Sequence, residues 1–257
     1  MARRIVDLSV PLQNGVPADP PRNLVQIEYT DHDQSAPLVA GLFPGLAPAD
    51  LPEGKGWAVE QVRLSTHTGT HVDAPWHYHP TAAGAPAPTI DALPLEWFFG
   101  PGVKLDFRHL PDGYVVGAAE IAAELARIGH VLTPGDIVVV NTAAGARYGA
   151  PDYMDRGCGM GREATLFLTG AGVRVVGTDG WSWDAPFRHT AARFAATGDA
   201  AIIWEGHKAG REAPYCQIEK LHNLEALPPT GFEIACFPVK LHRASAGWTR
   251  AVAIFTE

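Results

Sequence analysis

A run of four histidines and one aspartate is the part of this sequence best suited to chemistry. Four of the 11 histidines fall within 13 residues, and a carboxylate lies among them: His67, His71, Asp73, His77 and His79. Neutral imidazole and carboxylate are ligands that Zn²⁺, Mn²⁺ and Fe²⁺ prefer. A histidine-rich loop or a set of core histidines is the alternative, but the small residues in between leave room for a cation. The run predicts a metal site.

The spacing also indicates the backbone that carries these groups. His67 and His71 alone could be an i, i+4 pair on a helix, but Asp73 and His77 lie two and six residues further on, off that face. A glycine and a proline within the run would also break a helix. In an extended segment, positions 67, 71, 73 and 77 project to one side. We expect a strand that bends into a loop and delivers three or four ligands to one point.

This run resembles the signature of the cyclase family of metal-dependent hydrolases, which includes bacterial kynurenine formamidases and isatin hydrolases. The matching pattern is His67-x-Gly69-Thr70-His71-x-Asp73-x-Pro75-x-His77. Other segments resemble further family motifs, in order: the opening strand (Val6–Leu12), the central strand (Gly135–Thr142), a D-x-x-S-x-D turn (Gly177–Asp184), and His207 followed 12 residues later by Glu219. The resemblance covers most of the chain.

The resemblance implies a set of metal ligands. His67, His71 and Asp73 would hold one divalent ion, Zn or Mn, and His207 and Glu219 would complete the site. Two ions per chain are also compatible with this set, with Asp73 or Glu219 bridging them. The sequence does not choose the metal, because mixed imidazole and carboxylate sites accept several ions of similar size.

The resemblance places His77 at the family's catalytic position. A protein-bound metal brings the pKa of a water to about 7, so metal-bound hydroxide would attack the amide carbonyl. His77 would accept the proton from water and pass it to the leaving amine. The alternative is that His77 is one more ligand, because same-side spacing does not separate the two roles. His79 has no counterpart in the family and is interpreted as a residue that supports the metal ligands from behind or as a structural residue.

Five aromatic residues cluster around the presumed metal motifs: Trp76, Tyr78, Trp181, Trp183 and Phe187. An aromatic wall would suit a flat aryl substrate such as an N-formyl aniline or a fused lactam. Core packing is the alternative for each of them.

Two departures from the formamidases bear on the substrate. Formamidases of the family carry a tryptophan in the loop after the opening strand, but Gly15–Pro20 contains no aromatic residue. The chain also has an insertion at about 31–57, rich in Pro, Gly and Ala. Because of both departures, N-formylkynurenine, a compound of tryptophan catabolism, is only one candidate substrate. Cyclic amides, isatin-like lactams and other small acyl compounds are the others.

Competing functions remain at this stage. A non-catalytic metal-binding or ligand-binding protein could retain the scaffold, and an ester hydrolase or dehydratase could use the same metal site. A complete ligand set together with His77 favours an amide hydrolase, since a binding protein has no need of a proton-transfer group.

Composition is typical of a compact globular enzyme, with 46% hydrophobic and 19% charged residues. The net charge of −8 argues against a nucleic-acid surface, and no apolar run reaches the ~18 residues of a membrane span. Cys158, Cys216 and Cys236 are widely spaced, which indicates reduced thiols and a cytoplasmic location. The expected partner is a small-molecule substrate, without nucleic acid or membrane.

The pattern of apolar runs predicts strands and two helices. The expected strands lie at 102–107, 136–142, 173–179, 200–205, 232–241 and 250–256, and the helices at 118–128 and 161–168. This fits an α/β or α+β fold, and the resemblance implies the swivelling β/β/α fold with a mixed sheet and few helices. We expect one domain over 1–257, with a long loop or flap at 31–57.

The sequence also predicts assembly. The family resemblance implies a homo-oligomer, most simply a dimer, in which a neighbouring chain supplies part of each pocket. The segment 31–57 has apolar stretches such as Leu42–Leu46 with little periodicity to bury them, and a partner surface would provide that burial. The alternative is a flap folded over its own active site.

Overall fold

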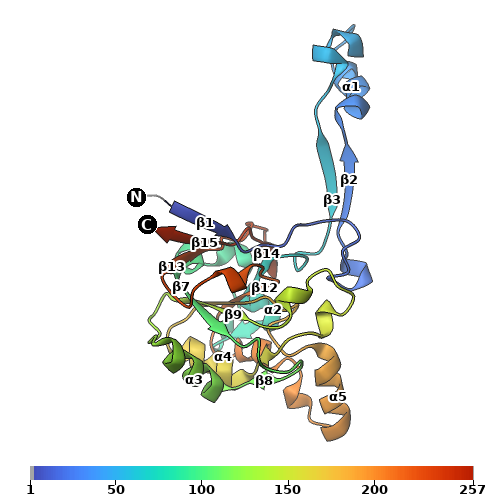
Figure 1. The fold of residues 1–257 in the computed structure, drawn as a ribbon. Coiled ribbons are helices and arrows are strands. Elements are labelled where there is room, and N and C mark those ends of the chain that lie inside the picture. The colour runs from blue at the N-terminus through green and yellow to red at the C-terminus, as the bar shows by residue number, and fades with distance from the viewer. Residues whose placement is uncertain (1–2, 257) are drawn as a thin grey trace.

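A nine-stranded mixed sheet dominates the computed structural model, which describes residues 3–256 (Figure 1). In spatial order its strands are β1 (Arg3–Asp7), β15 (Val252–Thr256), β13 (Phe232–Ala235), β7 (Phe99–Asp106), β9 (Ile137–Asn141), β11 (Val175–Thr178), β12 (Cys216–Glu219), β4 (His71–Asp73) and β14 (Ala246–Trp248). The four strands from β7 to β12 run parallel, and the remaining pairs are antiparallel. The predicted mixed α/β fold is confirmed.

Strand β9 shows why the core lies on both faces of this sheet. Ile137 and Val139 belong to one buried apolar cluster, and Val138 and Val140 belong to another. Alternate residues of a strand project to opposite faces, so an unbroken apolar run suits a strand that is covered on both sides. Helices α3 (Ala118–Ile128) and α4 (Arg162–Gly170) supply buried side chains to the second cluster.

Most expected elements are present. The strands expected at 102–107, 136–142, 173–179 and 250–256 fall on β7, β9, β11 and β15, and both expected helices form. Gly129 ends α3 at φ 68°, the left-handed conformation that glycine adopts readily. The strand expected at 200–205 is wrong: the side chain of Asp199 accepts a hydrogen bond from Ala201 N and begins a 3₁₀ turn instead. Only the first part of 232–241 is a strand.

The remaining elements are short, apart from one helix. They are α2 (Pro75–Tyr78), α5 (Phe187–Thr197), α6 (Glu205–Ala209), and the two-stranded pairs β5 (Thr81–Ala82) with β6 (Ala85–Pro86) and β8 (Val115–Val116) with β10 (Gly159–Met160). None of the helices within residues 3–256 is long and apolar enough to cross a membrane.

The insertion forms an arm rather than the long loop that was expected. Strands β2 (Gln26–Thr30) and β3 (Val59–Arg63) pair antiparallel and carry α1 (His32–Gly41) at their far end, away from the body (Figure 1). Asp31 begins α1 with a capping box: its side chain accepts from Gln34 N, and the Gln34 side chain accepts from Asp31 N. This pattern in the sequence could have revealed the helix. The segment is not a flap over its own site.

Candidate metal centre

The pairing of β4 with β12 brings ligand groups from distant segments onto one face. The register places His71 opposite Glu219 and Asp73 opposite Gln217. Directly opposed residues of an antiparallel pair project to the same side of the sheet. His71 Nε2 lies 3.6 Å from Glu219 Oε2 and 3.3 Å from Asp73 Oδ1. Three predicted ligands therefore share one buried position in the sheet.

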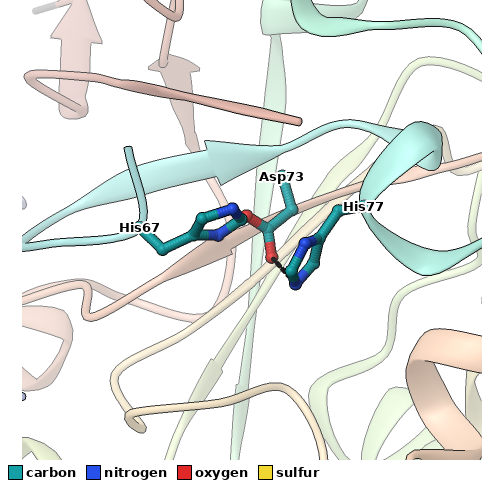
Figure 2. Close-up of side chains that lie close together, drawn as sticks. All are labelled: His67, Asp73 and His77. Carbon is teal, nitrogen blue, oxygen red and sulfur yellow. Dashed lines mark ion pairs between the residues drawn. The ribbon is translucent and has the colours of Figure 1, made fainter. Parts of the chain in front are cut away.

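His67 and His77 approach Asp73 from either side (Figure 2). His67 Nδ1 lies 2.8 Å from Asp73 Oδ1, and His77 Nε2 lies 3.8 Å from Asp73 Oδ2. Gly69, at φ 67°, turns the chain between His67 and β4. The expected extended segment is present only over β4, His71–Asp73, because His67 lies in a turn and His77 lies on the one-turn helix α2. Pro75 begins that helix at a position where proline costs nothing, instead of breaking it.

His207 reaches the same point from α6, oriented by Asp184. The Asp184 carboxylate accepts hydrogen bonds from Gly206 N at 2.7 Å, His207 N at 3.1 Å and His207 Nδ1. His207 Nε2 is thereby directed at the centre, 3.9 Å from Asp73 Oδ2 and 3.6 Å from Glu219 Oε1. A carboxylate that holds one ring nitrogen while the other faces the ligands is a common arrangement around protein-bound metals.

Gln217 is a residue of the centre that the sequence patterns did not identify. Its Nε2 lies 2.6 Å from His207 Nε2, 3.0 Å from Glu219 Oε1 and 3.2 Å from Asp73 Oδ2, and Tyr215 Oη donates to its Oε1. An amide has two N–H donors and cannot satisfy three acceptors at once. Its place two residues before Glu219 on a strand was the available signal, since such residues share a face.

The donor set fits a divalent cation. His71 Nδ1 donates to Gly69 O at 2.8 Å, so Nε2 keeps its lone pair, and this buried atom has no hydrogen-bond partner among the described residues. It faces the Asp73 and Glu219 carboxylates, which are also buried. Two groups could hold an ion, His67 with Asp73 and His77, and His71 with Asp73 and Glu219. Asp73 belongs to both, as a bridging ligand would.

The pKa values in the centre follow from burial and close charges. Burial opposes ionisation of Asp73, yet the neighbouring histidines hold its pKa well below the usual range. Burial raises the pKa of Glu219, and the charge of Asp73 adds to that effect. Burial lowers the pKa of His77 to about 4, against the pull of Asp73. His77 is therefore neutral at pH 7 and able to accept a proton.

A cavity of about 190 Å³ opens onto this centre, and only part of the predicted aromatic wall lines it. Trp181 and Phe187 lie at the cavity with His67, His77, His207 and Glu219. Three aromatic predictions are corrected: Trp76 is 44% exposed and does not line the cavity, Trp183 is fully buried and donates to Thr165 Oγ1, and Tyr78 is buried against Tyr215. His79, which was not predicted to line the cavity, contacts Thr81 through Nδ1.

Trp204 is the aromatic residue that the sequence analysis missed. Its ring stacks on His207 with centroids 4.5 Å apart and meets the His77 ring edge-on at 5.3 Å. Its backbone has φ 59°, a conformation that costs a bulky residue of order 1 to 3 kcal/mol and is concentrated at functional sites. Its apolar neighbours led to the prediction of a strand at 200–205, so the sequence did not indicate that the Trp204 side chain points into the cavity.

Asp184→Asn should weaken metal binding without removing a ligand. The amide can still accept from the backbone, but it no longer stabilises the His207 ring as the carboxylate does, so we expect about a 10- to 100-fold loss of metal affinity. Competition with a fluorescent chelator measures it. Asp50→Asn, on the exposed arm, is the control. An unchanged affinity in Asp184→Asn would show that His207 needs no orienting partner.

Comparison with known proteins gives a consistent class. Residues 6–185 match the family model described as "Putative cyclase". The chain is 30% identical over 242 residues to a kynurenine formamidase of Paracidovorax citrulli (strain AAC00-1), covering 86% of this chain and 94% of the relative.

Solved structures agree. Isatin hydrolase A from Labrenzia aggregata, bound to benzyl benzoate, superposes with a TM-score of 0.72 at 26% identity, over 99% of this chain and 94% of the other. Isatin hydrolase A from Ralstonia solanacearum shares the fold, with a TM-score of 0.75 at 23% identity over 99% and 92%. The fold and the site are those of a metal-dependent hydrolase. The chain belongs to the cyclase family, as its motifs predicted.

Proposed function

We propose that this protein hydrolyses the C–N bond of a small aryl amide, either a formamide or a cyclic amide, with Zn or Mn as its metal. One observation carries the proposal: buried carboxylates and imidazoles converge on Asp73 beneath a cavity of about 190 Å³ that has aromatic walls. The names of the relatives support it, since one is a formamidase and others are isatin hydrolases.

Each residue has a part in this reaction. His67, His71, Asp73, His207 and Glu219 would hold one or two ions. When bound, the metal supplies a Lewis acid that lowers the pKa of water and polarises a carbonyl.

His77 provides the proton transfer in this scheme. Its ring is neutral at pH 7 and lines the cavity, where it would lie beside a bound substrate. Trp204 packs against both His77 and His207 and limits the positions that their rings can take. Burial of the centre strengthens the electrostatic effects of these groups on the substrate.

A substrate panel tests the proposal against its competitors. Aryl formamides, isatins, cyclic imides and aryl esters are assayed with Zn²⁺ and Mn²⁺, and then with a chelator. We expect amide hydrolysis that the chelator abolishes and added metal restores. Metal binding without turnover of any compound would favour a binding protein, and esters cleaved faster than every amide would favour an esterase.

We also propose a homodimer in which the arm of each chain contacts the other. The arm, residues 26–63, projects from the body and exposes large apolar side chains, each more than 40% exposed: Tyr29, Leu38, Leu42, Phe43, Trp57, Val59 and Val62. A large exposed apolar surface that the rest of the chain does not bury is typical of a protein–protein interface. A symmetric pair is the commonest closed assembly.

Light scattering should therefore give twice the 27.5 kDa chain mass or a higher multiple. The variant Leu38→Glu/Leu42→Glu places charges on α1 and on its C-terminal cap, and it should shift the protein towards the monomer with a loss of activity. Val131→Glu, at a residue that is 84% exposed on the body, is the control. A wild-type monomer with full turnover would contradict the dimer.

We propose a cytoplasmic location because of the state of the three cysteines. Cys158, Cys216 and Cys236 are all buried free thiols, which persist in reducing compartments. Fractionation of cells that express the chain tests this.

A further inference from the structure

A second cavity, of about 420 Å³, lies beside the metal cavity, and the proposed reaction does not use it. It opens along helix α5 and is called the α5 cavity. Apart from Asp184 and Thr190, the residues that line it are apolar: Ala185, Phe187, Ala191, Phe194, Ile203 and Trp204. A lining of this kind suits an uncharged ring better than a polar group.

Two aromatic side chains belong to both cavities. Phe187 and Trp204 line the α5 cavity and also the cavity of about 190 Å³ at the metal centre. The Trp204 ring is stacked on His207 and meets His77 edge-on, so it lies directly against the centre. Phe187 is 48% exposed and lies further out. Trp204 is therefore the inner part of a wall between the two cavities.

The indole of Trp204 is held at this point against two unfavourable local effects. Its Nε1–H is buried and has no acceptor among residues 3–256, and a buried donor without a partner is destabilising. Its backbone, at φ 59°, lies in the left-handed region that a bulky residue adopts only at a cost. Strain of this kind is concentrated at functional positions, which indicates a functional role for the bulk of this ring.

The wall keeps the metal cavity small. An apolar cavity of about 150 Å³ accommodates one benzene molecule. The metal cavity, at about 190 Å³, therefore has room for one small ring system with its reacting group, but not for a second ring. The α5 cavity is larger and apolar, so it would accept a second ring if the wall were absent.

We propose that Trp204 is a specificity-determining residue, whose indole restricts the substrate to one small ring system by closing the metal cavity against the α5 cavity. This role rests on the hydrolytic function proposed above and deepens it. Trp204 neither binds the metal nor transfers a proton. It acts by occupying the space through which a substituent of the substrate would reach the apolar lining beyond.

A variant without the wall tests this with probes of two sizes. The small probe is formanilide, and the large probes are N-(biphenyl-3-yl)formamide and N-(biphenyl-4-yl)formamide. Trp204→Gly removes the indole at a residue whose left-handed φ glycine adopts readily. Relative to formanilide, kcat/KM for the better biphenyl compound should rise by roughly 10-fold or more, the effect of moving a phenyl group out of water. A ratio that does not rise overturns the proposal.

A second substitution locates the added ring. Ala191 lies on α5 and lines the α5 cavity but not the metal cavity. Ala191→Phe fills that space, so the double variant Trp204→Gly/Ala191→Phe should lose the gain. A gain that survives in the double variant contradicts the proposal. Two controls keep the wall, Ala191→Phe alone and Trp204→Phe, and both should retain the wild-type ratio.

The ratio distinguishes this role from a structural one. Loss of the indole also loosens the rings of His77 and His207, which lowers the rate on every probe and leaves the ratio unchanged. The proposed function and the wall also fail separately. If the metal-loaded wild-type protein hydrolyses none of the probes, the hydrolase function fails. The ratio of calorimetric Kd values then still tests the wall, because binding does not depend on turnover.

Discussion

Replacing His71 with alanine should remove metal and activity together. His71 is fully buried, its Nδ1 is held by Gly69 O, and its Nε2 faces Asp73 and Glu219. Loss of that ligand weakens the hold on the ion, and without the ion the two buried carboxylates lie close together with no cation beside them, which is strongly unfavourable. We expect metal content near zero after dialysis, measured by mass spectrometry, and no detectable hydrolysis.

The control for this variant is His79→Ala, in the same histidine-rich run. His79 bonds Thr81 and lies outside the cavity, so this change should leave metal content and rate within about 2-fold, as is usual for substitutions away from a site. Full metal occupancy in His71→Ala, with the fold intact by circular dichroism, would exclude His71 as a ligand.

His77→Ala should keep the metal and lose most of the turnover. Removal of a positioned acid–base group lowers kcat by about 10² to 10⁴. His77 Nε2 is 3.8 Å from Asp73 Oδ2 and belongs to one of the two groups that could hold an ion, so the metal content of this variant decides between the roles of ligand and proton carrier. The measurement pairs metal content with steady-state rates on the best amide of the panel.

Exogenous imidazole sharpens the same experiment. If His77 transfers protons, imidazole in the buffer should restore part of the rate in His77→Ala, because the cavity has gained the volume of the ring. A variant that is purified without metal would instead assign His77 as a ligand, and the proton-transfer role would then lie elsewhere.

The metal run was readable from the sequence because its residue types are specific and local. His67, His71 and Asp73 lie within seven residues, and the turn at Gly69 brings them close together. The central strand β9 was equally clear, since its apolar run suits a strand buried on both faces. The family motif added His207 and Glu219, which residue type alone did not single out.

Several aromatic residues were wrongly assigned to the cavity because their place depends on the direction of the side chain, which residue type does not give. Trp76 and Trp183 neighbour site residues in the chain, but α2 turns Trp76 to solvent and Trp183 packs into the core. Trp204 was hidden in an apolar run that resembles a strand. The sequence shows which residues are close to the metal ligands along the chain. The local backbone conformation decides which of their side chains enter the cavity.

The sequence by itself determined the chemistry of the centre: a cluster of imidazoles around one carboxylate, on an α/β scaffold of the cyclase family. The tertiary structure decided which other residues contact that cluster and line its cavity. Pairing of β4 with β12 places Gln217 between three polar groups, and long-range packing brings Asp19 to Lys220 at the cavity wall. The contacts of Gln217 with Asp73 and of Asp19 with Lys220 join residues more than a hundred positions apart. Their geometry depends on sheet register and core packing, which no local pattern encodes.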